Sequence, residues 1–245
     1  MSHSSSRPTS KPSPPPNQPL TPFTDVTGSP TATKSLLLIY DIFGYKPQTL
    51  QGCDLLASSS TLKVFLPDFL GPNAFSLADF SPDTPEKKQK LGSLFSGAGK
   101  PDETAERVLQ TLDAIKSTKE GEGVNGWGIL GYCWGGKVAG LAVQKAAASS
   151  PSPFKALGEV HPAMVDPSEA PKIHIPTIVL ASKDEDAAAV REFEEKLGTQ
   201  TKHVETFGDQ IHGWLGARSD LKDKRVKEEY ERGYGVLLKF FEEHV

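Results

Sequence analysis

The sequence predicts an α/β domain with a mostly parallel central sheet and helices on both faces. Apolar, strand-like runs alternate with helical patterns from residue 35 to the C-terminus. Most of these runs are continuously apolar, as expected for strands that are covered on both faces. The chain has 245 residues, 37% of them hydrophobic, which is enough for one large core. A repeated βα order of this kind gives strands that run parallel.

The individual elements follow from the same patterns. Strands are expected at residues 35–41, 61–67, 126–132, 154–161, 176–182 and 203–207. Helices are expected at residues 48–58, 102–117, 136–149, 186–197 and 222–243. Pro101, followed by Asp102 and Glu103, marks the start of the second helix. Proline suits the first helical turn, and acidic side chains there interact favourably with the helix dipole.

Residues 1–30 differ from the rest of the chain. Ser, Pro and Thr dominate this segment, and aliphatic residues are almost absent. Such a composition cannot bury enough apolar surface to offset the entropy of ordering. The sequence therefore predicts a disordered Ser/Pro-rich tail over residues 1–30 and a single domain over residues 31–245.

Composition excludes several classes of partner. The formal net charge is -4, and charges of both signs are well mixed, unlike a nucleic-acid-binding surface. No apolar run approaches the length of a membrane span. Two cysteines cannot form a disulfide framework, and no secretory signal is visible. We expect a cytoplasmic protein, a monomer or weak homodimer, with no nucleic-acid or membrane partner, no metal and no cofactor.

The most informative stretch is residues 131–136, Gly-Tyr-Cys-Trp-Gly-Gly. It joins a predicted strand to a predicted helix, which is the layout of a nucleophile elbow with cysteine in place of serine. Such a turn is strained and needs small neighbours. The thiol of Cys133 then stands at a helix N-terminus, where the dipole favours a thiolate. Cys133 is therefore the candidate nucleophile, whereas Cys53 is interpreted as a packing residue.

Two further candidates follow Cys133 in the chain. Asp184 comes directly after a predicted strand, and His212 lies between the last strand and the last helix. This order of nucleophile, acid and histidine is that of α/β-hydrolases. Glu185 and Asp186 are rivals for the acidic position, and Asp186 is also a candidate cap for the next helix.

Three motifs in this order resemble the dienelactone hydrolase (carboxymethylenebutenolidase) family, with fungal and other eukaryotic members the most similar. They are residues 131–136, residues 40–44 (Tyr-Asp-Ile-Phe-Gly) and residues 210–214 (Gln-Ile-His-Gly-Trp). The resemblance covers about residues 24–245. It implies a single-domain α/β-hydrolase fold and a carboxylic ester hydrolase that acts on small-molecule lactones and related esters.

The resemblance also implies a role for each member of a Cys-His-Asp triad. Cys133 corresponds to the nucleophile that forms an acyl-enzyme. His212 corresponds to the base that later acts as an acid, and Asp184 to the carboxylate that orients it. The lactone would be opened by the thiolate, and water would then release the acid.

The first motif implies two more functions. The family carries an acidic residue there that meets the thiol in the resting enzyme, and Asp41 fills this position. The backbone N–H groups of Ile42 and Trp134 would form the oxyanion hole. Each such donor contributes on the order of 100-fold or more in rate.

The sequence gives only weak candidates for substrate binding: His161, Trp214 and Arg218. Family members from bacteria hold the substrate carboxylate with arginines, and Arg218 is displaced from the corresponding offset. Residues 69–100 carry several aromatic and aliphatic side chains between prolines and glycines. They are interpreted either as a specificity rim that covers the site or as an ordinary surface excursion.

Two alternatives remain beside the hydrolase. A thiol with a low pKa would also serve a redox-sensing or binding module built on a hydrolase scaffold. A glutamine amidotransferase also places cysteine on a glycine-rich elbow, but its histidine precedes its acid. Here Asp184 precedes His212, which disfavours that class.

Overall fold

The computed structural model describes residues 25–58, 61–148 and 152–245. Its centre is a seven-stranded sheet of order β1-β3-β2-β4-β5-β6-β7. Strand β1 pairs antiparallel with β3, and every other neighbouring pair is parallel. The strands are β1 (Asp25–Gly28), β2 (Lys34–Ile39), β3 (Leu62–Leu66), β4 (Gly126–Tyr132), β5 (Phe154–Val160), β6 (Thr177–Ser182) and β7 (Lys202–Phe207).

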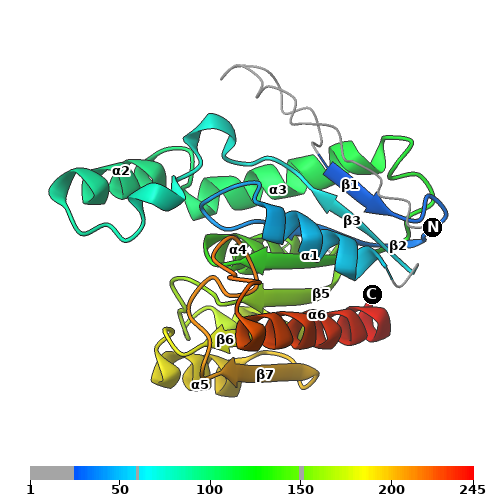
Figure 1. Cartoon of the computed structure of the whole chain (residues 1–245). Helices are drawn as coiled ribbons and strands as arrows, with labels where there is room; N and C mark the ends of the chain where they lie inside the picture. The colour runs from blue at the N-terminus through cyan, green and yellow to red at the C-terminus, as the bar shows by residue number, and fades with distance from the viewer. Residues whose placement is uncertain (1–24, 59–60, 149–151) are drawn as a thin grey trace.

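Helices cover both faces of this sheet (Figure 1). One face carries α1 (Pro47–Ala57) and α6 (Lys224–His244), and the other carries α3 (Pro101–Lys116), α4 (Trp134–Ala147) and α5 (Ala187–Lys196). Helix α2 (Pro85–Ser96) projects away from the body at the left of Figure 1. The described residues also include three 3-10 turns: η1 (Gly71–Asn73), η2 (Leu77–Asp79) and η3 (Ala170–Lys172).

All of the predicted strands and helices are present, with ends shifted by a residue or two. Strand β1 is not predicted by the sequence because it is short and polar, and such a strand is stabilised by its partner β3 rather than by its own pattern. It also falls inside the segment predicted as tail, so residue 31 is too late a start for the domain. Residues 1–24 of that predicted tail lie outside the described residues.

Helix α2 was also missed, although its start carries a clear signal. The Thr84 hydroxyl accepts a hydrogen bond from the Lys87 backbone N–H, and Pro85 occupies the first turn. Among its residues only Leu94 is buried, because the helix projects from the body. With so little apolar surface to bury, the periodicity of this segment is weak.

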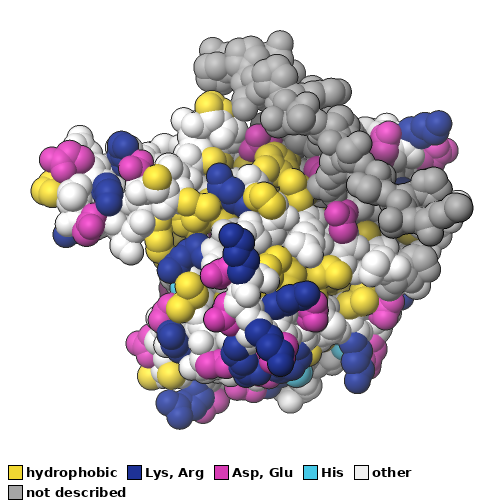
Figure 2. Space-filling model, viewed as in Figure 1, with side chains coloured by type: hydrophobic (Ala, Val, Ile, Leu, Met, Phe, Trp, Pro, Cys, Tyr) yellow, Lys and Arg dark blue, Asp and Glu magenta, His cyan; other side chains and the backbone are white. Residues whose placement is uncertain are grey.

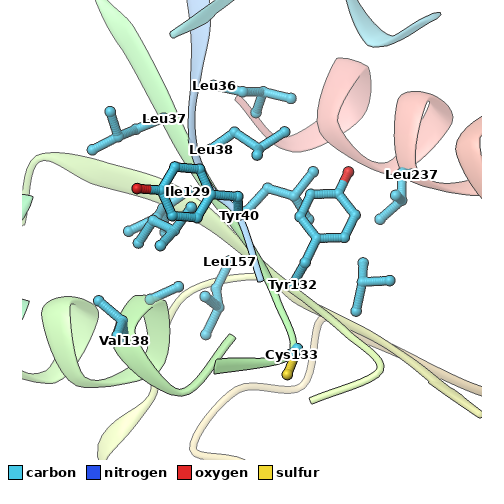
Figure 3. Packing of buried hydrophobic residues seen from close by; sticks show 14 of the residues in the cluster. Leu36, Leu37, Leu38, Tyr40, Ile129, Tyr132, Cys133, Val138, Leu157 and Leu237 are labelled. Carbon is cyan, nitrogen blue, oxygen red and sulfur yellow. The ribbon is translucent and has the colours of Figure 1, made fainter. Parts of the chain in front are cut away.

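The core lies between the sheet and the two helix layers. Leu36, Leu37, Leu38 and Ile39 are fully buried on both faces of β2, as a continuous apolar run predicts. Figure 3 shows the three leucines of β2 together with Leu237 of α6. The outer surface of α6 carries interspersed acidic and basic side chains (Figure 2), several of them in ion pairs. Within the three described ranges, no helix combines the length and apolarity needed to cross a membrane.

One buried carboxyl group makes stability depend on pH. Glu159 on β5 faces α4, where a Cβ on Gly140 would lie 2.6 Å from Glu159 Oε1. Burial, and then the nearby Glu169 charge, raises the pKa of Glu159 to about 8, against the opposing influence of Lys137. The folded state therefore holds a proton that the unfolded chain releases near pH 4.5. Its stability falls as the pH rises from that value to about 8.

Replacing Glu159 with glutamine should remove this dependence. At pH 9 we expect Glu159→Gln to raise the free energy of unfolding by roughly 1–3 kcal/mol, and at pH 4 the two proteins should be equal. Urea unfolding at several pH values measures the difference. A constant difference between the two proteins across the range would show that Glu159 is not protonated in the fold.

Candidate active site

Cys133 lies at the carboxyl end of β4, the central strand of the sheet, and begins α4 as its N-cap. Its backbone has φ 54° and ψ -117°, the strained conformation of a nucleophile elbow. The Cys133 N–H donates to the Val160 carbonyl at 3.0 Å, and the Cys133 carbonyl accepts from Gly136 N–H at 3.0 Å and Ala163 N–H at 3.1 Å. These bonds hold the strained turn, and its sulfur points away from the leucine-rich cluster (Figure 3).

Two glycines make this turn possible because the backbone passes very close to them. A Cβ on Gly131 would lie 2.0 Å from the Gly135 carbonyl oxygen. A Cβ on Gly135 would lie 2.3 Å from the carbonyl oxygen of Ile39, at the end of β2. The elbow is therefore pressed against the neighbouring strand, and both positions exclude any side chain.

His212 joins the thiol to a carboxylate. Its Nδ1 lies 2.6 Å from Glu185 Oε1, and the Cys133 thiol is near enough to the ring to favour its charged form. Since Nδ1 faces Glu185, Nε2 is the nitrogen left to pair with the thiol. Ser182 fixes the Glu185 carboxylate through its backbone N–H and its hydroxyl. The Glu185 side chain is only 4% exposed, so this contact is shielded from solvent.

These contacts control the charge of His212. Burial alone would lower the pKa of its imidazole, but the neighbouring Cys133 and Glu185 outweigh burial and raise it to about 10. At neutral pH the ring is therefore an imidazolium between two groups that favour positive charge. Such a ring is the natural counter-ion of a thiolate.

The acid on the histidine ring is Glu185, not the expected Asp184. Asp184 is exposed, and its Oδ2 accepts the His212 backbone N–H at 2.8 Å. It therefore fixes the loop rather than the ring. Asp186 caps α5, as one interpretation of the sequence had it, because its Oδ1 accepts the first free N–H groups of that helix. Among the three consecutive carboxylates, only the one with a longer side chain reaches Nδ1.

Asp41 lies at the end of β2 and is almost fully buried. Its Oδ1 accepts the Phe43 N–H and its Oδ2 accepts the Ala217 N–H, both at 3.0 Å. Burial raises the pKa of this carboxyl to about 6, although both backbone bonds and the charge of His212 favour the ionised form. Both carboxylate oxygens are thus bonded to backbone N–H groups, and the expected contact between Asp41 and the thiol remains a prediction.

The two expected oxyanion-hole residues flank the elbow. Trp134 is the first residue of α4, so its N–H has no acceptor within the helix. Ile42 follows β2, which pairs in parallel with β4 up to Ile39 and Gly131. Both residues are buried. The two residues therefore follow neighbouring strand ends, as the expected oxyanion hole requires, and that hole remains a prediction.

His161 packs against the His212 ring in the interior and does not line a substrate pocket. It is fully buried, and its ring centroid is 5.1 Å from that of His212 and 5.8 Å from that of Tyr132. Burial, and then the charge of His212, lowers its pKa well below the ordinary value, so the ring is neutral. Neither ring nitrogen has a hydrogen-bond partner among the described residues.

The other two weak candidates differ in position. Trp214 is fully buried and stacks on Phe207 with ring centroids 4.2 Å apart, so it is a core residue that substrate cannot reach. Arg218 donates from Nη1 to the His212 carbonyl at 2.5 Å. Its guanidinium also lies over the Phe80 ring, 4.5 Å from the centroid. Arg218 therefore supports the loop that carries the histidine.

A cavity of about 340 Å³ opens beside His212. Residues 162–165, after β5, give it mainly apolar walls, and residues 184–186, after β6, give it an acidic edge. Among its described lining residues there is none from 69–100, so the expected specificity rim does not form this cavity. A larger hollow of about 590 Å³ lies within residues 73–98, against α2.

A parallel sheet with a strained nucleophile elbow after its central strand and a histidine loop after its last strand defines an α/β-hydrolase. The chain belongs to the dienelactone hydrolase family, whose family model matches residues 23–245. Hydrolase activity follows from this membership.

Two relatives and one solved structure are similar to the chain. Two uncharacterized AIM2 family proteins of Schizosaccharomyces pombe are 33% and 32% identical to the chain over 223 residues each. These matches cover 89% of this chain in both cases and 86% and 85% of the relatives. The crystal structure of a dienelactone hydrolase from Anabaena variabilis superposes with a TM-score of 0.65 and 16% identity, covering 90% of each chain.

Proposed function

We propose that this protein hydrolyses lactones or related carboxylic esters through an acyl-enzyme on Cys133. The observation that supports this most directly is the hydrogen bond from His212 to the buried Glu185 carboxylate, beside the strained elbow that carries Cys133. The elbow presents the nucleophile, the histidine moves protons, and the buried carboxylate orients the ring and stabilises its charge.

The proposed reaction has two steps. The Cys133 thiolate attacks the carbonyl carbon, and the resulting oxyanion accepts hydrogen bonds from the N–H groups of Ile42 and Trp134. The C–O bond to the leaving group then breaks, and the His212 imidazolium supplies the proton that the leaving oxygen needs. In the second step a water molecule attacks the thioester, gives a proton to His212 and releases the acid and the thiol.

Acylation itself prepares the second step. The hydrogen bond to Cys133 is one of the causes that hold the proton on His212. In the acyl-enzyme the sulfur is bonded to carbon and carries no charge, so this influence on the histidine disappears. The pKa of His212 then falls towards its ordinary range, and the ring becomes a better base for the attacking water.

Trapping the acyl-enzyme tests the proposal. Purified protein would be mixed with p-nitrophenyl acetate and with a dienelactone, and intact mass would be recorded during turnover. We expect hydrolysis together with a mass increase equal to the acyl group, and both should vanish in Cys133→Ala. Hydrolysis that persists in Cys133→Ala, or rapid thiol oxidation without turnover of any ester or lactone, would contradict the proposal.

The charge of His212 gives a prediction for the reactivity of the thiol. Because the pKa of His212 is raised to about 10, its ring is an imidazolium at neutral pH. We expect iodoacetamide to alkylate Cys133 at pH 7, and in His212→Gln, which lacks this positive charge, the rate should fall by about 10-fold or more. Equal rates in the two proteins would show that His212 does not control the thiol.

A further inference from the structure

Residues 69–100 form an excursion between β3 and α3, and both of its ends are bonded to the residues of the proposed oxyanion hole. At its beginning, the Phe75 backbone N–H donates to the Ile42 carbonyl at 2.7 Å. At its end, the Gly99 carbonyl accepts the indole N–H of Trp134 at 2.7 Å. Both bonds are buried, since Phe75, Ile42 and Trp134 are all at most 6% exposed.

The indole bond is particular to Trp134. The chain has three tryptophans, and the ring nitrogens of Trp127 and Trp214 are buried without a hydrogen-bond partner among the described residues. The core of this protein therefore does not require every buried indole to be paired. Of the three indole N–H groups, the one that is hydrogen bonded belongs to Trp134, the residue that follows Cys133.

Other contacts fix the same two ends of the excursion. The Arg107 guanidinium on α3 donates to the Phe69 carbonyl at 3.1 Å and to the Ala98 carbonyl at 2.9 Å, so it clamps the beginning to the end. Phe80 packs edge-on against Phe43, with ring centroids 5.4 Å apart. The ends are thus held close to the elbow, whereas α2 in the middle projects from the body (Figure 1).

We propose that the excursion sets the position of the two oxyanion-hole N–H groups, with Trp134 and Phe75 as positioning residues. The inference rests on the proposed hydrolytic function and extends it to a part of the chain that does not line the cavity beside His212. Oxyanion donors act only at about 2.7–3.1 Å from the developing charge, and a displacement of about 1 Å can cost on the order of 100-fold in rate. Bonds that anchor Ile42 and Trp134 therefore control catalysis without contacting the reacting atoms.

Trp134→Phe is the direct test, because it removes the indole N–H and keeps an aromatic ring in the core. We expect kcat for p-nitrophenyl acetate to fall by about 10–100-fold, with KM changed by less than about 3-fold. Trp127→Phe is the matched control, since it removes a buried indole N–H that has no partner. Its kcat should stay within about 2-fold of the native value.

Alkylation separates positioning of the oxyanion hole from damage to the elbow. Iodoacetamide reacts with a thiolate at a saturated carbon, so no oxyanion forms and the hole is not used. Trp134→Phe should therefore alkylate at Cys133 within about 2-fold of the native rate while its ester turnover falls. A parallel loss of alkylation, or unchanged ester turnover, would overturn the inference.

Arg107→Gln provides a second route if Trp134→Phe folds poorly. Arg107 is only partly buried, and the change loosens the clamp between Phe69 and Ala98 without altering the elbow. The same pattern of reduced kcat with preserved alkylation is expected. Absence of Cys133-dependent turnover in the native protein would instead refute the proposed function, and the inference would fall with it.

Discussion

Glu185→Gln is expected to lower kcat/KM for ester hydrolysis on the order of 10³-fold, although the protein folds normally. Glu185 Oε1 lies 2.6 Å from His212 Nδ1, and the carboxylate is held by Ser182 in a shielded position. A neutral amide keeps the size of the side chain but no longer stabilises the imidazolium, and its NH₂ group can favour the wrong tautomer of the ring. In Ser-His-Asp hydrolases the analogous loss is about 10⁴-fold.

Asp184→Asn is the matched control for this variant. The asparagine oxygen can still accept the His212 backbone N–H that Asp184 accepts at 2.8 Å. We expect its kcat/KM to stay within about 3-fold of the native value. Steady-state kinetics on purified proteins, with stability checked by thermal unfolding, decide the matter. A large loss in Asp184→Asn and a small one in Glu185→Gln would return the orienting role to Asp184.

Gly131→Ala should destabilise the protein severely. The new Cβ would lie 2.0 Å from the Gly135 carbonyl oxygen and 2.3 Å from its carbon, and these are backbone atoms of the elbow and not the end of a flexible side chain. Relieving the overlap would separate β4 from the start of α4 and break the strained turn at Cys133. We expect a loss of more than about 4 kcal/mol in the free energy of unfolding, measured with urea, or failure to accumulate as folded protein.

Gly136→Ala tests whether this effect comes from the overlap itself. Gly136 lies five residues later in the same motif, but its nearest atom to a new Cβ would be 3.5 Å away, which is ordinary contact. Alanine also favours a helix over glycine by about 1 kcal/mol. This variant should be as stable as the native protein or slightly more stable. Equal destabilisation of both variants would show that the close approach at Gly131 is not what the fold depends on.

The architecture could be predicted because it depends on local patterns. Continuous apolar runs marked the buried strands, and the glycines around Cys133 marked a turn that only small residues can form. The order of Cys133 and His212 along the chain then placed both at the same edge of a parallel sheet. Each of these inferences needed only short stretches of sequence and the geometry of parallel strands.

Details that depend on tertiary contacts could not be predicted in the same way. Asp184, Glu185 and Asp186 form a turn, and no periodicity says which of three consecutive side chains in a turn points inward. The structure separates them by reach, since only Glu185 meets the His212 ring. The burial of Trp214 is similar, because it depends on packing against Phe207 from another element. Helix α2 was missed because it packs so little apolar surface.

The wide separation of the site residues along the chain has a consequence for synthesis. Asp41 holds the histidine loop through the Ala217 N–H, a contact that spans 176 residues. The elbow at Cys133 is complete long before Glu185, His212 and Ala217 have been translated, since chains are made from the N-terminus. A growing chain therefore carries Cys133 without its imidazolium partner. On the proposed mechanism, the contacts that activate its thiol form only when nearly the whole protein has been made and folded.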